Sequence, residues 1–141
     1  MFPKTIKSVD FNGNEREQTY YFNLTEAELV KLQASMDGGL TEYAKKIMET
    51  QDIPKLMALF EQLILASYGE KSPDGSRFIK VDPVRGRLAD EFAQTNAYSD
   101  MFMEFLDNPQ VGIDFFNSVI PAKLHDNSEA GKPYPPSIEK T

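Results

Sequence analysis

One segment, from Asp52 to Ile64, limits the possible folds more than any other part of the sequence. Asp52 is a residue type that caps helices, and Pro54 stands in the first turn, where its missing N–H is not needed. The apolar residues that follow recur at helical spacing: Leu56, Leu59, Phe60, Leu63 and Ile64. A stripe this broad needs other elements around it. The sequence therefore predicts a central core helix that ends near Gly69.

Further helices are signalled on both sides of this segment. Thr25 and Glu28 form a capping box, and the helix that they open is expected to end at Gly38-Gly39. The remaining helices are expected over Leu40 to Glu49, from Asp82-Pro83 through Phe92, after the cap Thr95, and after Asn108-Pro109. In the helix from Asp82-Pro83, Val84, Leu88 and Phe92 would form the apolar side.

The first part of the chain has the pattern of a β-hairpin. Asn12-Gly13 separates two β-compatible runs, Thr5 to Phe11 and Glu15 to Phe22, and favours a type I′ turn. Because side chains alternate along a strand, Tyr20 and Phe22 would share one face. A turn at Ser72 to Gly75 leads into a second short β-like piece, Arg77 to Lys80.

Together these signals predict a mainly helical α+β fold in one domain over residues 1–120. An N-terminal β-hairpin, within residues 1–23, would pack on a bundle of five to six helices. From Pro121 the periodicity is lost, and Lys132-Pro133-Tyr134-Pro135-Pro136 favours an extended polyproline conformation. Residues 121–141 are expected to form a flexible C-terminal tail.

Charge and apolar content restrict the partners. The net charge of −7 argues against nucleic acid and anionic membranes as main partners. No apolar run approaches the roughly 20 residues that cross a bilayer, the first residues lack a secretory pattern, and cysteine is absent. We therefore expect a cytoplasmic protein. No basic residue lies between Arg87 and Lys123, and acidic residues there alternate with aromatic ones, which would suit a basic, partly apolar protein partner.

No catalytic, metal or cofactor site is predicted. His125 is the only histidine, and it lies in the polar tail, where nothing would hold it rigidly. Asp100 and Glu104 are four residues apart, as paired catalytic or metal-binding carboxylates can be, but no third ligand joins them. A solvated acidic helix face explains this pair better.

Two helices carry the candidate partner-binding residues. Met103 falls off the apolar stripe of the helix after Thr95, among Asp100, Glu104 and Asp107. In the helix after Asn108, the apolar residues cover an arc of about 200°, wider than one core needs. That helix is either sandwiched between elements of its own domain or has a face left for another chain. The residues of that helix expected to contribute to partner contact are Ile113, Phe116 and Ile120.

Three stretches resemble a known family: Tyr20 to Leu29, Ser67 to Lys80, and Thr95 to Glu104. Together they are similar to tail assembly chaperones of long-tailed, siphovirus-type bacteriophages. The resemblance implies a non-enzymatic protein that binds and solubilises the tape measure protein and helps recruit the major tail tube protein. It also implies a possible homo-oligomer in the host bacterial cytoplasm that is absent from the mature virion. Two alternatives remain open, a structural tail component retained in the virion and a small enzyme with a hidden site.

Overall fold

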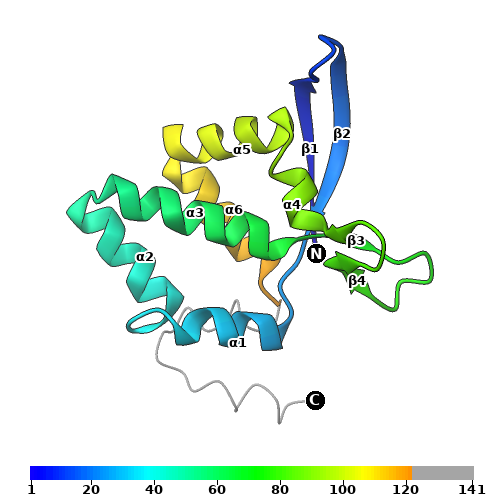
Figure 1. Ribbon diagram of the computed structural model, residues 1–141. Coiled ribbons are helices and arrows are strands. Elements are labelled where there is room, and N and C mark those ends of the chain that lie inside the picture. Colours follow the sequence, from blue (N-terminus) through cyan, green and yellow to red (C-terminus); the bar gives the residue numbers. More distant parts are fainter. Residues whose placement is uncertain (122–141) are drawn as a thin grey trace.

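The computed structural model describes residues 1–121, in which helices pack with antiparallel strands (Figure 1). Six helices are present over these residues, as predicted for a mainly helical α+β fold, and the N-terminal hairpin is confirmed. In chain order the elements are β1 (Phe2–Val9), β2 (Glu15–Phe22), α1 (Glu26–Ala34), α2 (Gly39–Thr50), α3 (Ile53–Ser67), β3 (Tyr68–Lys71), β4 (Phe78–Ile79), β5 (Val81–Asp82), β6 (Gly86–Arg87), α4 (Leu88–Phe92), α5 (Asn96–Asp107) and α6 (Pro109–Val119). None of the described helices is long and apolar enough to cross a membrane.

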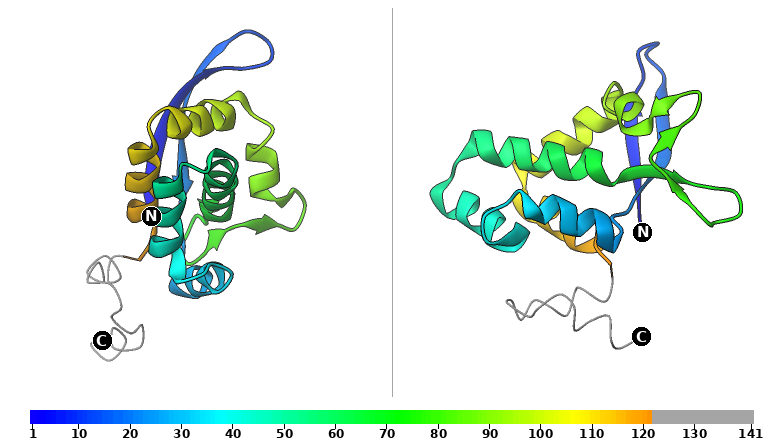
Figure 2. Two further views of the ribbon diagram at one scale, coloured as in Figure 1. Left: turned by 90° about the vertical axis from the view of Figure 1, so that its left-hand side faces the viewer. Right: turned by 60° about the horizontal axis from the view of Figure 1, so that its bottom comes forward.

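The central helix is α3, as the sequence predicts. Its stripe is buried along the whole helix, and α3 crosses the middle of the molecule with α1 and α2 on one side and α5 on the other (Figures 1 and 2). Gly112 of α6 lies so close to Phe60 that an added Cβ would approach the ring to 2.6 Å. The aromatic rings of Tyr68 and Phe92 stack at 4.4 Å and join α4 to the sheet.

The sheet is larger than the predicted hairpin. Its strand order is β1-β2-β3-β4, with every neighbouring pair antiparallel. β1 and β2 pair along their full length, from Phe2 opposite Phe22 to Val9 opposite Glu15, and their outer half projects past the helices (Figure 1). β3 was not predicted, because Tyr68 to Lys71 is too short to show an alternating pattern after a helix.

The hairpin turn differs from the predicted type I′ turn. The N–H of Gly13 donates to the carbonyl of Asp10 at 3.0 Å, and among the described residues of this turn only Gly13 has a positive φ, of 85°. The side chain of Asp10 explains the difference. Its carboxylate accepts the backbone N–H groups of Asn12 and Asn14, each at 2.9 Å, which favours a five-residue loop over a two-residue one.

The prediction of a helix that begins at Asp82-Pro83 is wrong about where that helix starts. Val81–Asp82 and Gly86–Arg87 instead form a small second hairpin, and α4 begins only at Leu88. The Asp82 carboxylate accepts the N–H groups of Val84 and Arg85 at 2.9 and 2.8 Å, which stabilises a turn in place of a helix cap. Val84, predicted to face the core, is 92% exposed.

The first helix also ends earlier than predicted. α1 stops at Ala34, and Ser35 closes it by bonding its hydroxyl to the carbonyl of Leu32 at 2.9 Å. Met36 is buried all the same, from the connection to α2. The predicted tail lies outside the described residues, apart from Pro121.

Candidate partner-binding surface

The fifth helix, α5, separates its two faces cleanly. Thr95 caps it by accepting the N–H of Tyr98 at 3.1 Å. Ala97, Met101 and Phe105 are buried on the inner side. The four predicted contact residues of this helix are all exposed on the outer side: Asp100, Met103, Glu104 and Asp107. We call these four residues the acidic face of α5.

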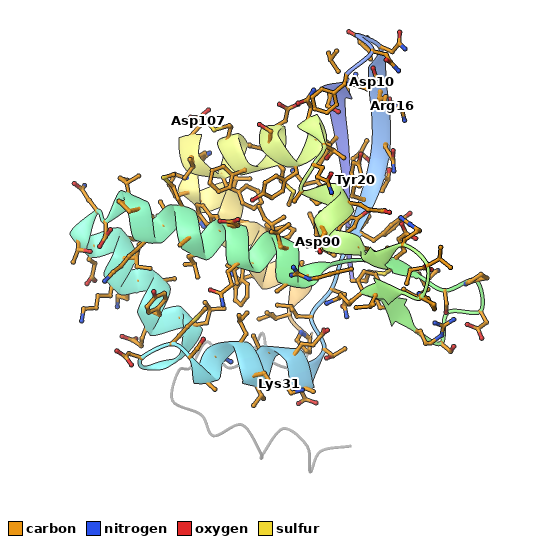
Figure 3. All side chains as sticks on the ribbon, in the orientation of Figure 1. Asp10, Arg16, Tyr20, Lys31, Asp90 and Asp107 are labelled. Atoms are coloured by element: carbon orange, nitrogen blue, oxygen red, sulfur yellow. The ribbon has the colours of Figure 1, made fainter. Side chains whose placement is uncertain are left out.

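The acidic face begins beside the N-terminal hairpin. Glu104 forms an ion pair with Lys4 of β1 at 3.2 Å, and the amide of Asn96 donates to the carbonyl of Val9 at 2.7 Å. These two contacts fix α5 along β1. Within the described residues Asp100 and Asp107 form no ion pair, so their charges are available to a partner (Figure 3 places Asp107 at the end of α5).

The helix α6 contributes less surface than its sequence suggests. Phe116 and Ile120 are partly buried and pack against the hydrophobic core, and α6 contacts α5, α3 and β1. Ile113 is also partly buried but lies outside the core cluster. For Phe116 and Ile120, packing between elements of the same domain therefore accounts for most of the wide apolar arc. Ile113 and Met103 are the predicted apolar residues left for a partner.

Exposed apolar residues also occur where no contact was predicted. Phe11 at the hairpin turn is 79% exposed, and Val9 beside it is exposed as well. Ile53 and Met57 lie one turn apart on the outer side of α3. The exposure of Ile53 and Met57 could have been predicted from the sequence, because both fall off the apolar stripe of α3. Isolated apolar residues on a surface are common, however, and do not by themselves indicate a contact.

No group of three or more histidine, cysteine, aspartate or glutamate side chains is placed to hold a metal ion in residues 1–121. One notch of about 360 Å³ lies between β2 and β3. Its walls are Gln18, Thr19, Tyr20 and Tyr21 on one side, and Tyr68, Gly69, Glu70 and Lys71 on the other.

A family model described as phage tail assembly chaperone matches residues 1–140 of the chain. The chain belongs to this family. The protein is therefore a tail assembly chaperone, and this family implies protein partners in tail assembly. The family suggests a non-enzymatic role. Searches of curated proteins and of solved structures gave no match.

Proposed function

We propose that this chaperone binds the tape measure protein, keeps it soluble and helps recruit major tail tube subunits before the tube is built. The observation that carries the proposal is the family match over residues 1–140. We further propose that it acts without catalysis in the host cytoplasm, as a homo-oligomer, and leaves before the virion is complete. Membership of the phage tail assembly chaperone family supports this proposal.

The acidic face of α5 is the surface that we assign to partner contact. Asp100 and Asp107 lie seven residues apart, which puts them about two turns, or roughly 10 Å, from each other along the helix. Met103 lies between them and is 49% exposed. A flexible apolar side chain between two unpaired carboxylates suits a partner segment that is both basic and apolar. Ile113 of α6 extends the proposed contact.

Co-expression with the tape measure protein tests the proposal. We expect the chaperone to increase the soluble fraction of the tape measure protein and to co-purify with it. A tape measure protein that is equally soluble alone and never co-purifies would refute the role.

A pair of matched variants tests the assigned surface. The variant Asp100→Asn/Asp107→Asn removes two charges from the acidic face, and Glu42→Gln/Glu49→Gln removes two exposed charges from α2. We expect the first variant to recover less tape measure protein, and the second to behave as the unmodified chain. Equal recovery of the tape measure protein by both variants would show that the acidic face of α5 is not the contact surface.

The alternative of a structural tail component is separated by location. Mass spectrometry of purified virions should detect a tail component in fixed ratio to the tube protein, whereas a chaperone should be missing. Detection at a stoichiometric level would replace the proposed role with the structural one.

A further inference from the structure

The two edges of the N-terminal hairpin are in different states. In an antiparallel pair, successive residues direct their N–H and C=O groups alternately toward the partner strand and away from it. The bond from the Asp10 N–H to the Asn14 carbonyl, at 2.8 Å, points inward. It follows from the register that the backbone groups of Pro3, Thr5, Lys7 and Val9 of β1, and of Glu15, Glu17 and Thr19 of β2, point outward.

The outer edge of β1 is blocked at its two ends. Pro3 has no N–H to offer a further strand. At the other end of the strand, the Val9 carbonyl accepts the Asn96 amide at 2.7 Å. Between them, Lys4 is tied to Glu104, so α5 packs against this strand. These are the protections that natural sheets use against unwanted strand pairing.

The outer edge of β2 is open over Glu15 to Thr19. β3 pairs with β2 only at Tyr21 and Phe22, opposite Gly69 and Tyr68. Beyond that point all five residues from Glu15 to Thr19 are exposed. Over this stretch the described chain provides no strand that pairs with β2 on its outer side.

The departure of β3 from β2 is fixed by packing. Arg85 holds the Glu70 carboxylate with two hydrogen bonds, of 3.1 and 3.0 Å, on the side of α4. An added Cβ at Gly69 would lie 2.7 Å from the carbonyl of Ile79, so only glycine lets β4 cross so closely. Glu70 and Lys71 therefore pair with β4, and the notch of about 360 Å³ stays between the two strands.

We propose that the open edge of β2 binds an extended segment of a partner protein that carries lysine or arginine at alternate positions. The segment adds a strand beside Glu15 to Thr19, with one end entering the notch, and its N–H and C=O groups pair with those of Glu17 and Thr19. Glu15 and Glu17 lie on one face of β2, and neither forms an ion pair within the described chain. Basic side chains two residues apart would lie opposite both glutamates.

Charge disfavours a second copy of this chain as the occupant. Antiparallel pairing of two β2 edges keeps outward groups opposite outward groups. A register centred on Glu17 then places Glu17 against itself, and one centred on Arg16 places Glu15 against Glu17 twice. Like charges directly opposite each other are destabilising. A register centred on Gln18 avoids this clash but leaves Glu15 without a charged partner.

The test uses the full chain, the synthetic peptide TKVKVKT, and the same peptide methylated at the backbone nitrogens of its three lysines. The two peptides carry equal charge, but only the first can donate N–H groups to β2, because the lysines are the residues that lie opposite the outward-directed residues of this strand. We expect only the first peptide to bind in a fluorescence anisotropy titration, and to slow the amide hydrogen exchange of Glu17 and Thr19. Equal binding of both peptides would overturn the proposal, because charge alone would then explain the attraction.

Two proline variants at one cross-strand pair provide the matched control. Glu17 and Lys7 face each other in the register, and both direct their N–H outward, so neither substitution removes a β1–β2 ladder bond. We expect Glu17→Pro to weaken peptide binding by about tenfold or more, and Lys7→Pro to leave it within about twofold. An equal loss in both variants would overturn the proposal.

A charge reversal keeps the test decisive if Glu17→Pro does not fold. Glu17→Lys should weaken binding of TKVKVKT and strengthen binding of its acidic counterpart TEVEVET. If Glu17→Lys prefers the basic peptide over the acidic one as strongly as the unmodified chain does, the edge of β2 is not the binding site. Self-association of the unmodified chain that is abolished by Glu17→Lys would also overturn the proposal, because a second copy would then be the occupant. Because this surface is separate from the acidic face of α5, these outcomes are distinct from the co-expression test of the chaperone role.

Discussion

Lys80, between β4 and β5, forms hydrogen bonds to three other segments of the chain. Its ammonium group donates to the carbonyls of Asn23 and Ala66, at 3.0 and 2.7 Å, and to the Glu28 carboxylate at 3.0 Å. Burial lowers the pKa of Lys80, and the hydrogen bond and charge of Glu28 oppose that shift. One side chain therefore joins the ends of β2 and α3 to the first turn of α1.

Replacing Lys80 should destabilise the fold. Lys80→Met keeps most of the apolar stem but leaves two carbonyls and a carboxylate without their donor. We expect the free energy of unfolding to fall by about 2–3 kcal/mol. Urea unfolding followed by circular dichroism measures it, with the exposed Lys71→Met as the matched control. Equal stability of the two variants would show that solvent replaces the lost bonds.

Asp74 should make the stability of the β3–β4 turn sensitive to acid. The backbone N–H of Ser76 and the hydroxyls of Ser72 and Ser76 all donate to its carboxylate, and they lower the pKa of Asp74 to about 2, from an ordinary value of 3.8. Because the pKa is lowered on folding, the stabilisation is complete above pH 3.8 and is lost as the pH falls toward 2.

The variant Asp74→Asn tests this pH dependence. We expect it to be less stable than the unmodified chain at neutral pH, and the difference to shrink between pH 3.8 and about 2. Thermal unfolding at a series of pH values provides the measurement. A difference that stays constant down to pH 2 would contradict the assignment to the carboxylate charge.

At the residue scale, local signals were predictable and distant contacts were not. The capping box of Thr25 and Glu28 is present, with bonds of 3.2 and 2.9 Å, because both partners lie within one turn. The exposure of Met103 followed from helical spacing in the same way. The ion pair of Glu104 with Lys4 joins residues one hundred positions apart, and no spacing rule could indicate it.

Among the elements, α6 depends on one small residue for its position. An added Cβ at Gly112 would lie 2.6 Å from the Phe60 ring of α3 and 3.2 Å from the Phe105 ring of α5. Glycine inside a helix usually costs about 1 kcal/mol relative to alanine. Here that cost is outweighed by the close packing of three helices.

The variant Gly112→Ala should therefore be destabilising, against its helix propensity. We expect a net loss of about 1–3 kcal/mol, because the rings must shift in a packed core. Thermal unfolding compared with Asn117→Ala, an exposed position on the same helix, separates packing from propensity. A stabilised Gly112→Ala variant would show that α6 can move outward at little cost.

The long amphipathic elements were predictable, and the short ones were not. α3 and α5 carry several turns of pattern, and β2 was placed at its observed limits. β3, β5 and β6 have only two to four residues each, so their pairing depends on neighbours and turns. The Asp82 turn shows how one side chain can override a helix signal that proline also favours.

For the whole molecule, the last members of the core along the described part of the chain are Val119 and Ile120. We therefore expect a chain of residues 1–121 to fold with the same helix content and the same melting temperature as the full chain. A fall in melting temperature of several degrees would show that residues 122–141 add to the stability of the domain.

The architecture at this scale could be predicted only as a class. The sequence indicates a hairpin and helices, and both are present, but it contains no signal for how β2 finds β3. These strands are separated by three helices, and their pairing at Tyr21 and Gly69 is decided by the packed core. The open edge of β2 was hidden for the same reason.

The two ends of the described domain are bonded to each other. The N–H of Leu24, just after β2, donates to the carbonyl of Val119 at 3.0 Å, and the rings of Phe2 and Phe115 meet at 5.6 Å. The first strand therefore cannot complete its core contacts until the last helix has been synthesised. On the ribosome, the apolar residues of the growing chain therefore stay exposed to aggregation until nearly the whole domain has been synthesised. Only after that can the protein assist another protein.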